Sequence, residues 1–175
     1  MGVNAGAGPD AHNGASTGGR SRTGAEANRQ DASGLLLPDL DDPTSAPFWA
    51  GTGRGELLVQ ACGSCGRWRM PPRPMCPHCR SLETTWVATS GRATIWSYVV
   101  AHPPLLPAYA EFAPYNVITV ALDEDPQIRF VGNLVTGPDG SIGEIDPTTI
   151  TIGEPVEVVY SRVDDVTLPR WTRCA

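Results

Sequence analysis

Four of the five cysteines stand in two C-x-x-C pairs, and this spacing constrains the fold more than any other feature of the sequence. The pairs are Cys62/Cys65 and Cys76/Cys79, with ten residues between Cys65 and Cys76. Each pair places two thiolates on one tight turn, and two facing turns complete a tetrahedron of sulfur ligands. Zinc suits such a site, and iron also fits four sulfurs, so the spacing alone does not distinguish the two metals. Because four thiolates close the coordination shell, we predict one structural metal ion per chain.

Cysteine usage and charge narrow the class of protein further. An odd number of cysteines, with four of them inside an 18-residue window, indicates a metal site in a reducing compartment rather than a disulfide framework. The N-terminus lacks the blocks of a signal peptide, so we expect a cytoplasmic protein. No apolar stretch approaches the ~20 residues that span a bilayer, so no membrane association is expected. The net charge of −6 argues against binding to nucleic acid or to anionic lipid.

The N-terminal part of the chain divides into two segments. Residues 1–34 consist mainly of small and polar residues, which bury too little surface to offset the entropy of ordering, so we predict a disordered tail. Residues 35–55 are predicted to be a docking segment, with a helix start at residues 44–47, where Ser or Thr precedes proline. The adjacent Phe48 and Trp49 need burial, either on this domain or in a partner subunit.

The pattern becomes β from residue 56 onward. Residues 56–84 are assigned to the zinc ribbon and residues 85–175 to a barrel domain. β-Branched and aromatic residues extend from 86 to 101, where Ser90-Gly91 predicts a turn or a strong bend. Further strands are predicted at Tyr115–Leu122, Ile128–Val135 and Pro155–Arg162, the last of the chain. Because no long segment has a helical apolar period, the sequence predicts a mainly β fold, with a small barrel after a metal ribbon.

The ribbon segment also gathers basic residues around one aromatic. Arg67 and Arg69 flank Trp68, and Arg73 and Arg80 lie nearby. On a zinc ribbon these residues could contact nucleic acid, or they could face an acidic partner or the phosphates of coenzyme A. The simplest interpretation is that they are solvated and partly balance the charge of the metal–thiolate centre.

The order of these motifs resembles the zinc-ribbon and OB-fold family known as domain of unknown function thirty-five. The resemblance covers residues 47–172 and rests on FW, GELLVQACGSCGRWRMPPRPMCPHCRS, PYNVITVALDED, IRFVGNLV and IGEPVEVVYSR. It implies a short N-terminal helical segment, a rubredoxin-like zinc ribbon and a five-stranded OB-fold barrel. It also implies that the metal ligands are Cys62, Cys65, Cys76 and Cys79.

The same resemblance implies a function. Members of this family commonly act as accessory subunits of thiolase-fold enzymes that handle acyl-CoA esters. One branch pairs with a lipid-transfer-protein-type, thiolase-like aldolase that releases propionyl-CoA from a steroid side chain. The expected assembly is therefore a hetero-oligomer, most simply a heterotetramer, in which the acyl-CoA substrate binds near the interface. A partner that is a biosynthetic or degradative thiolase is the alternative within the family.

The sequence offers no catalytic set of its own. It contains neither a nucleophile elbow nor a phosphate-cradling glycine loop, and Asp123, Glu124 and Asp125 are typical of a solvated hairpin tip. His102 could act as an acid–base group or touch a thioester, whereas a hydrogen-bonded surface histidine is the simpler interpretation. We therefore predict no catalytic residue in this chain.

An apolar loop at residues 103–114 is the most distinctive candidate for an interaction surface. Its prolines lower the entropic cost of ordering it against another molecule, although it could instead fold back over the barrel. The predicted partner-binding residues lie in the helical segment and in this loop: Phe48, Trp49, Leu105, Leu106, Tyr109 and Phe112.

Two other classes of function compete with an accessory subunit. OB folds and zinc ribbons both bind nucleic acids, but the acidic composition and the lack of a basic stripe on the predicted strands argue against that class. A stand-alone zinc hydrolase needs an open coordination position, which four cysteine ligands do not leave.

Overall fold

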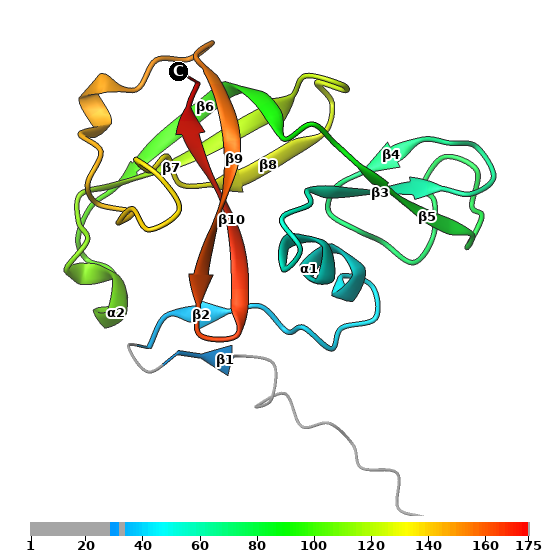
Figure 1. The fold of residues 1–175 in the computed structure, drawn as a ribbon, viewed down its shortest axis with the longest axis horizontal. Coiled ribbons are helices and arrows are strands. Elements are labelled where there is room, and N and C mark those ends of the chain that lie inside the picture. The colour runs from blue at the N-terminus through cyan, green and yellow to red at the C-terminus, as the bar shows by residue number, and fades with distance from the viewer. Residues whose placement is uncertain (1–28, 32–33, 175) are drawn as a thin grey trace, which may run out of the picture.

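Three sheets and three short helical segments make up the computed structural model, which describes residues 29–31 and 34–174 (Figure 1). The N-terminal sheet pairs β1 (Arg29–Gln30) with β2 (Leu36–Leu37). The ribbon sheet has the order β4-β3-β5 and the barrel sheet the order β10-β9-β6-β7-β8. None of the described helices is long and apolar enough to cross a membrane. The other elements are α1 (Ala46–Thr52), β3 (Leu58–Cys62), β4 (Trp68–Arg69), β5 (Thr84–Ala88), β6 (Arg92–Ala101), α2 (Pro107–Ala110), β7 (Tyr115–Leu122), β8 (Arg129–Gly132), η1 (Pro147–Thr149), β9 (Pro155–Val163) and β10 (Val166–Arg173).

The five-stranded sheet curls into a nearly closed barrel, which confirms the predicted OB-fold architecture (Figure 1). A bulge between Ile95 and Ser97 increases the twist of β6. The sheet closes where the chain after β8 reaches β10. There the Trp171 N–H donates to the Asn133 carbonyl at 3.0 Å, and the Val135 N–H donates to the Trp171 carbonyl at 2.8 Å. Before this point the described parts of β8 and β10 are not paired, so the barrel keeps a seam between them.

The core of the barrel follows from strand alternation. Along β7, every second side chain from Asn116 to Leu122 is buried, while the residues between them are half-exposed. A period of two in β-branched residues places one face of a strand on the core. Trp171, 1% exposed, is among the largest buried side chains and packs on Phe130 from the opposite strand, with ring centroids 6.2 Å apart.

One buried polar side chain helps to close the barrel. Asn116 is fully buried, and its amide group bonds both backbone groups of Leu134: Nδ2 donates to the carbonyl at 3.0 Å, and Oδ1 accepts from the N–H at 2.7 Å. Leu134 forms the isolated bridge to Trp171 at the closure. Asn116 therefore replaces a missing strand partner for Leu134, whose backbone groups would otherwise be buried without hydrogen bonds.

α1 begins where the sequence predicts, with Ser45 at the N-cap position, but the Ser45 side chain caps no N–H of the helix. Asp42 accepts a hydrogen bond from the Ser45 hydroxyl at 2.7 Å, and Pro47 lies in the first turn. Phe48 is 3% exposed and stacks on Phe130 of the barrel core, with ring centroids 6.1 Å apart. Trp49 is half-buried and meets Phe48 edge-on. Phe48 therefore packs on its own domain and not in a partner subunit.

The ribbon and the barrel join after β5. β5 pairs with β3 throughout its length, so the predicted division between residues 84 and 85 falls inside a ribbon strand. The chain turns at Gly91, which has φ +75°, and a Cβ there would overlap the Val158 side chain. Glycine is the only residue that fits both the backbone conformation and the close approach of β9. The bend predicted at Ser90-Gly91 is confirmed.

Three sequence expectations require correction. β9 is not the last strand, because β10 follows it. Pro169 makes this segment unlike a strand in the sequence. The proline is tolerated because β10 is an edge strand. β8 ends at Gly132 rather than at residue 135, because the next residue turns its carbonyl to Trp171. Residues 29–30 belong to the segment predicted to be disordered, but they form β1, which pairs with β2. Residues 1–28 and 32–33 of that segment lie outside the described residues.

Replacing Asn116 tests its role in barrel closure. Asn116→Ala leaves the N–H and the carbonyl of Leu134 buried without partners, so we expect a loss of about 2–4 kcal/mol in the free energy of unfolding. Asn133→Ala is the matched control: its amide makes one bond, from Nδ2 to the Asn116 carbonyl, and it should cost about 1 kcal/mol. Urea denaturation of both variants measures the difference, and equal losses would contradict the assigned role.

Candidate metal centre and neighbouring surfaces

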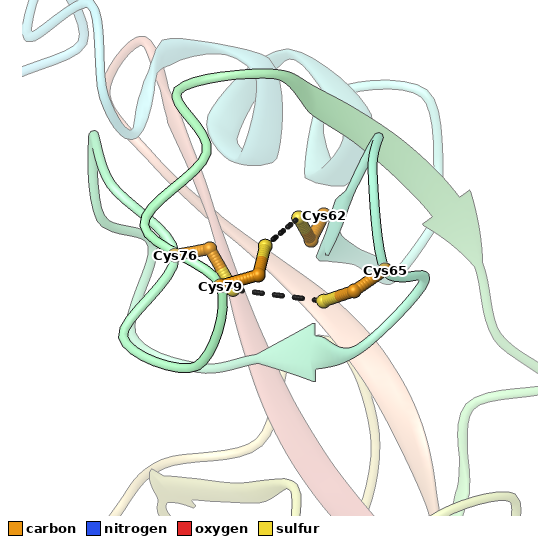
Figure 2. A group of neighbouring side chains, drawn as sticks. All are labelled: Cys62, Cys65, Cys76 and Cys79. Atoms are coloured by element: carbon orange, nitrogen blue, oxygen red, sulfur yellow. Dashed lines mark hydrogen bonds between the residues drawn. The ribbon is translucent and has the colours of Figure 1, made fainter.

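The two knuckles of the ribbon bring the four paired cysteines into one cluster (Figure 2). The Sγ atoms of Cys62 and Cys79 lie 3.5 Å apart and those of Cys65 and Cys76 lie 3.8 Å apart, and all four sulfurs lie within 4.8 Å of one another. A tetrahedral zinc ion with bonds of about 2.3 Å requires sulfur separations of about 3.8 Å. The cluster therefore fits a four-coordinate metal with no position left for water or substrate.

Each knuckle is closed by the same backbone geometry. The Gly66 N–H donates to the Cys62 carbonyl at 2.9 Å, and the Arg80 N–H donates to the Cys76 carbonyl at 2.9 Å. Both residues follow the second cysteine of their pair and have positive φ, +70° for Gly66 and +63° for Arg80. Glycine adopts this left-handed conformation without strain, whereas arginine does so at a cost of about 1–2 kcal/mol.

The electrostatics of the cluster favour a bound cation. The backbone N–H of Cys65 lowers the pKa of the Cys62 thiol to about 6, and the backbone N–H of Cys79 likewise lowers the pKa of Cys76. A hydrogen bond from the Ser81 backbone lowers the pKa of Cys79, but the neighbouring sulfurs and burial outweigh it and raise that pKa to about 12. Four thiolates this close repel one another, so all four ionise together only around a positive ion.

Side chains around the knuckles tie them together. The Ser64 hydroxyl lies 2.8 Å from the Ser81 hydroxyl and 2.9 Å from a carboxylate oxygen of Glu83. The Gly63 N–H donates to the Glu83 carbonyl at 2.9 Å. These bonds link the first knuckle to the second and to the strand that leads into the barrel. The arrangement is that of a structural metal site.

The arginines of the ribbon differ in exposure, although Arg67, Arg69 and Arg73 line one pocket. Arg69 is 7% exposed, and its Nε donates to the Gln60 side-chain oxygen at 2.5 Å across the β3–β4 pair. The same oxygen accepts the backbone N–H of Arg73 at 2.8 Å. Arg69 is therefore largely buried and connects β4 to β3, while Arg67 and Arg73 are exposed. Sequence reasoning missed Gln60, whose role depends on the register of β3 and β4.

The structure separates the predicted partner-binding residues into two groups. Phe48, Trp49 and Tyr109 line one apolar groove of about 680 Å³, together with Leu36 and Leu37. The Tyr109 hydroxyl accepts the Leu36 N–H at 3.3 Å, which holds the loop against β2. The groove lies over the seam of the barrel, since residues of β8 and β10 complete its lining.

The other three predicted residues lie on the loop outside this groove. Leu106 is 58% exposed, while Leu105 and Phe112 are half-buried. His102 directly follows β6 and is exposed, and His78 is exposed in the second knuckle. Among the described residues, neither histidine belongs to a cluster with the cysteines or lines the groove.

Comparisons with known proteins agree with this geometry. Residues 49–85 match the family model of the ChsH2 rubredoxin-like zinc ribbon domain, and residues 86–161 match that of the ChsH2 C-terminal OB-fold domain. The chain is 31% identical over 141 residues to the 3-oxo-4,17-pregnadiene-20-carboxyl-CoA hydratase alpha subunit of Mycobacterium tuberculosis, covering 81% of this chain and 41% of that protein. It is 33% identical over 113 residues to a DUF35 domain-containing scaffold protein of Methanothermobacter thermautotrophicus, covering 63% of this chain and 75% of that one.

A solved structure is also similar. The match is a chain of the Ltp2-ChsH2(DUF35) aldolase, with a TM-score of 0.66 and 33% identity over 78% of this chain and 99% of that chain. The fold and the four-sulfur site thus define a zinc-ribbon and OB-fold protein whose metal is zinc. More specifically, the chain belongs to the DUF35 family, with both domains of the ChsH2 type. It spans less than half the length of the Mycobacterium tuberculosis hydratase subunit.

Zinc analysis of a cysteine variant tests the ligand set. Cys76→Ser removes one thiolate, so we expect loss of bound zinc and a lower Tm, because zinc binding supplies folding free energy to such ribbons. Cys174→Ser is the matched control, since Cys174 is exposed and lies outside the cluster. Metal content by mass spectrometry and thermal unfolding measure both effects. Full zinc retention with an unchanged Tm would contradict the ligand assignment.

Paired substitutions at the knuckles test the backbone geometry. Gly66→Ala introduces a Cβ with no heavy atom within 4 Å. The expected loss of about 1 kcal/mol in the free energy of unfolding therefore comes only from the left-handed backbone conformation, which alanine adopts with strain. Arg80→Gly relieves the same strain and should raise stability by up to about 1 kcal/mol, net of the greater freedom of glycine in the unfolded chain. Chemical denaturation of the zinc-loaded protein should give shifts of opposite sign, and shifts of the same sign would refute the explanation.

Proposed function

We propose that this chain is a non-catalytic accessory subunit that binds and stabilises a thiolase-fold enzyme acting on acyl-CoA esters in steroid breakdown. The specific reaction proposed for the complex is retro-aldol cleavage of a β-hydroxyacyl-CoA steroid side chain, with release of propionyl-CoA. The observation that carries the proposal is the match to a chain of the Ltp2-ChsH2(DUF35) aldolase, which covers 99% of that chain at 33% identity.

The chemistry of the chain supports a non-catalytic role. Its metal site is closed by four sulfurs, so the zinc has no open position for substrate or water. In the part of the chain that the structure describes, His78 and His102 are exposed and neither is hydrogen-bonded to a serine, threonine or cysteine side chain that could act as a nucleophile. The groups that break the carbon–carbon bond must then come from the partner subunit.

The surfaces of the chain support binding to a partner. Leu106 is 58% exposed on a proline-rich loop, and Trp49 is half-buried beside a large apolar groove. The proposed partner contacts are Trp49, Leu105, Leu106, Tyr109 and Phe112. Phe48 is not among them, because it is 3% exposed and packs in the core of its own domain. The groove is the proposed location of the acyl-CoA substrate near the interface, since its lining is mainly apolar and includes the cationic side chain of Arg170.

A nucleic-acid-binding role has less support. Arg69, the central arginine of the ribbon cluster, is 7% exposed and its Nε is hydrogen-bonded to Gln60, so little of the side chain is available to a phosphate backbone. The strands of the barrel contain arginines but no lysine, and the chain carries a net charge of −6. Binding of single strands through phosphate contacts requires a positively charged groove.

Reconstitution with the partner tests the proposal. The full chain is co-expressed with the thiolase-fold protein of its own organism, and propionyl-CoA release is measured from a steroid β-hydroxyacyl-CoA. We expect no turnover from the isolated chain, and turnover from the co-purified complex. Thiolysis of a 3-oxoacyl-CoA in place of aldol cleavage would assign the complex to the thiolase alternative. Turnover by the isolated chain would overturn the accessory role.

A histidine variant tests whether the chain contributes acid–base chemistry. His102→Ala is expected to assemble normally and to leave kcat and its pH profile unchanged, because the side chain is exposed and lies outside the groove. The measurements are size-exclusion chromatography of the complex and a pH–rate profile. Normal assembly with abolished cleavage would make His102 a catalytic residue and contradict the proposal.

A further inference from the structure

The outer face of the barrel sheet carries an apolar patch that no described part of the chain covers. Its large exposed side chains are Trp96 and Val99 on β6 and Val131 on β8, which are 52%, 61% and 70% exposed. β7 contributes Val117 and Thr119 between them, because Val99 pairs with Val117 and Val131 pairs with Thr119. These five residues, named here the barrel-face patch, extend across three adjacent strands. Exposed apolar surface of this continuity marks an interaction site.

The charge around the patch differs from that of the rest of the chain. The Arg129 guanidinium lies over the Trp96 ring, with its carbon 3.8 Å from the ring centroid. β6, β7 and β8 contain no Asp or Glu, although the chain has 19 acidic residues. No acidic side chain among the described residues forms an ion pair with Arg129. A complementary surface is therefore apolar and presents a carboxylate opposite Arg129.

The edge of β8 extends this surface to the seam of the barrel. The Leu122 N–H donates to the Ile128 carbonyl at 3.1 Å. Strand alternation then directs the backbone N–H and carbonyl of Arg129 and Val131 away from β7 and into the seam. No backbone hydrogen bond from another described residue reaches these groups across the seam. The same two residues line the apolar groove, so patch, edge and groove are continuous. An exposed strand edge of this kind can pair with another chain.

We infer that the barrel-face patch is the surface on which the thiolase-fold partner subunit docks. Apolar side chains of the partner cover Trp96, Val99 and Val131, and a carboxylate of the partner pairs with Arg129. The inference rests on the proposed function and deepens it by naming the surface. Tryptophan and arginine, which meet here beside exposed valines, are enriched among binding hot spots. The surface differs from the one predicted from sequence, since none of its residues lies in the helical segment or in the 103–114 loop.

Binding measurements on surface variants test the inference. The full chain and the thiolase-fold subunit of its own organism are studied by biolayer interferometry. Val131→Glu places a charge against the partner's apolar surface and is expected to raise Kd about tenfold or more. Ile152→Glu is the matched control, because Ile152 is 62% exposed and lies outside the patch, and it should leave Kd within about twofold of the wild-type value.

A second pair of variants isolates the charge. Arg129→Ala is expected to weaken binding and to flatten its dependence on NaCl concentration, because an ion pair across an interface weakens with ionic strength. Arg162→Ala, at an exposed position on β9, should change neither. Zinc content and Tm are measured first for every variant. If Val131→Glu lowers either, Arg129→Ala carries the test, since truncating an exposed side chain preserves the fold.

The outcomes separate the surface from the proposed function. If the wild type binds, Val131→Glu and Arg129→Ala weaken binding, and both controls leave it unchanged, the result supports docking on the patch. If Val131→Glu and Arg129→Ala both bind as tightly as the wild type, the partner docks elsewhere and the inference is overturned, while the proposed function stands. No wild-type binding to the thiolase-fold subunit refutes the proposed function and the surface with it.

Discussion

Metal–sulfur bonding is the interaction on which the two halves of this protein depend. The ribbon has only three short strands, and its knuckle turns are mostly exposed, so zinc takes the place of a hydrophobic core there. β3 carries this effect into the barrel. Cys62 ends the strand in the metal cluster, while Val59 on the same strand and Leu57 just before it are buried in the barrel core. Fixing the sulfur cluster therefore fixes the strand that connects ribbon and barrel.

Incomplete closure of the barrel leaves an apolar groove beside an exposed sheet face. Trp171 and the amide of Asn116 close one end of the seam between β8 and β10, and the other end stays open as an apolar groove. The zinc site takes no part in these surfaces, because its coordination is complete. This division suits the proposed accessory role, in which a rigid metal-braced fold presents a sheet face and a groove to the partner that would carry the chemistry.

The parts of the site that sequence predicts are those fixed by local spacing. Two C-x-x-C pairs dictate two knuckles, since ligands two residues apart on a tight turn converge on one point. The alternation of YNVITVAL fixes β7 at Tyr115–Leu122, as predicted, because one face of the strand must be apolar. Arg69 is different. Its sequence neighbours suggest an exposed basic cluster, and only the pairing of β4 with β3 brings Gln60 beside it and buries its guanidinium.

The sequence by itself determined the metal cluster, the helix start at Ser45, most of the strands and the family to which the chain belongs. Tertiary structure alone decided where the large side chains went. Phe48 could have been buried in a partner, yet it stacks on Phe130, which lies 82 positions later in the chain. Trp96 and Val131 could have been core residues, yet they face outward and are 52% and 70% exposed. Local patterns depend on chain geometry over a few residues, whereas the burial of one side chain depends on neighbours that only the completed fold assembles.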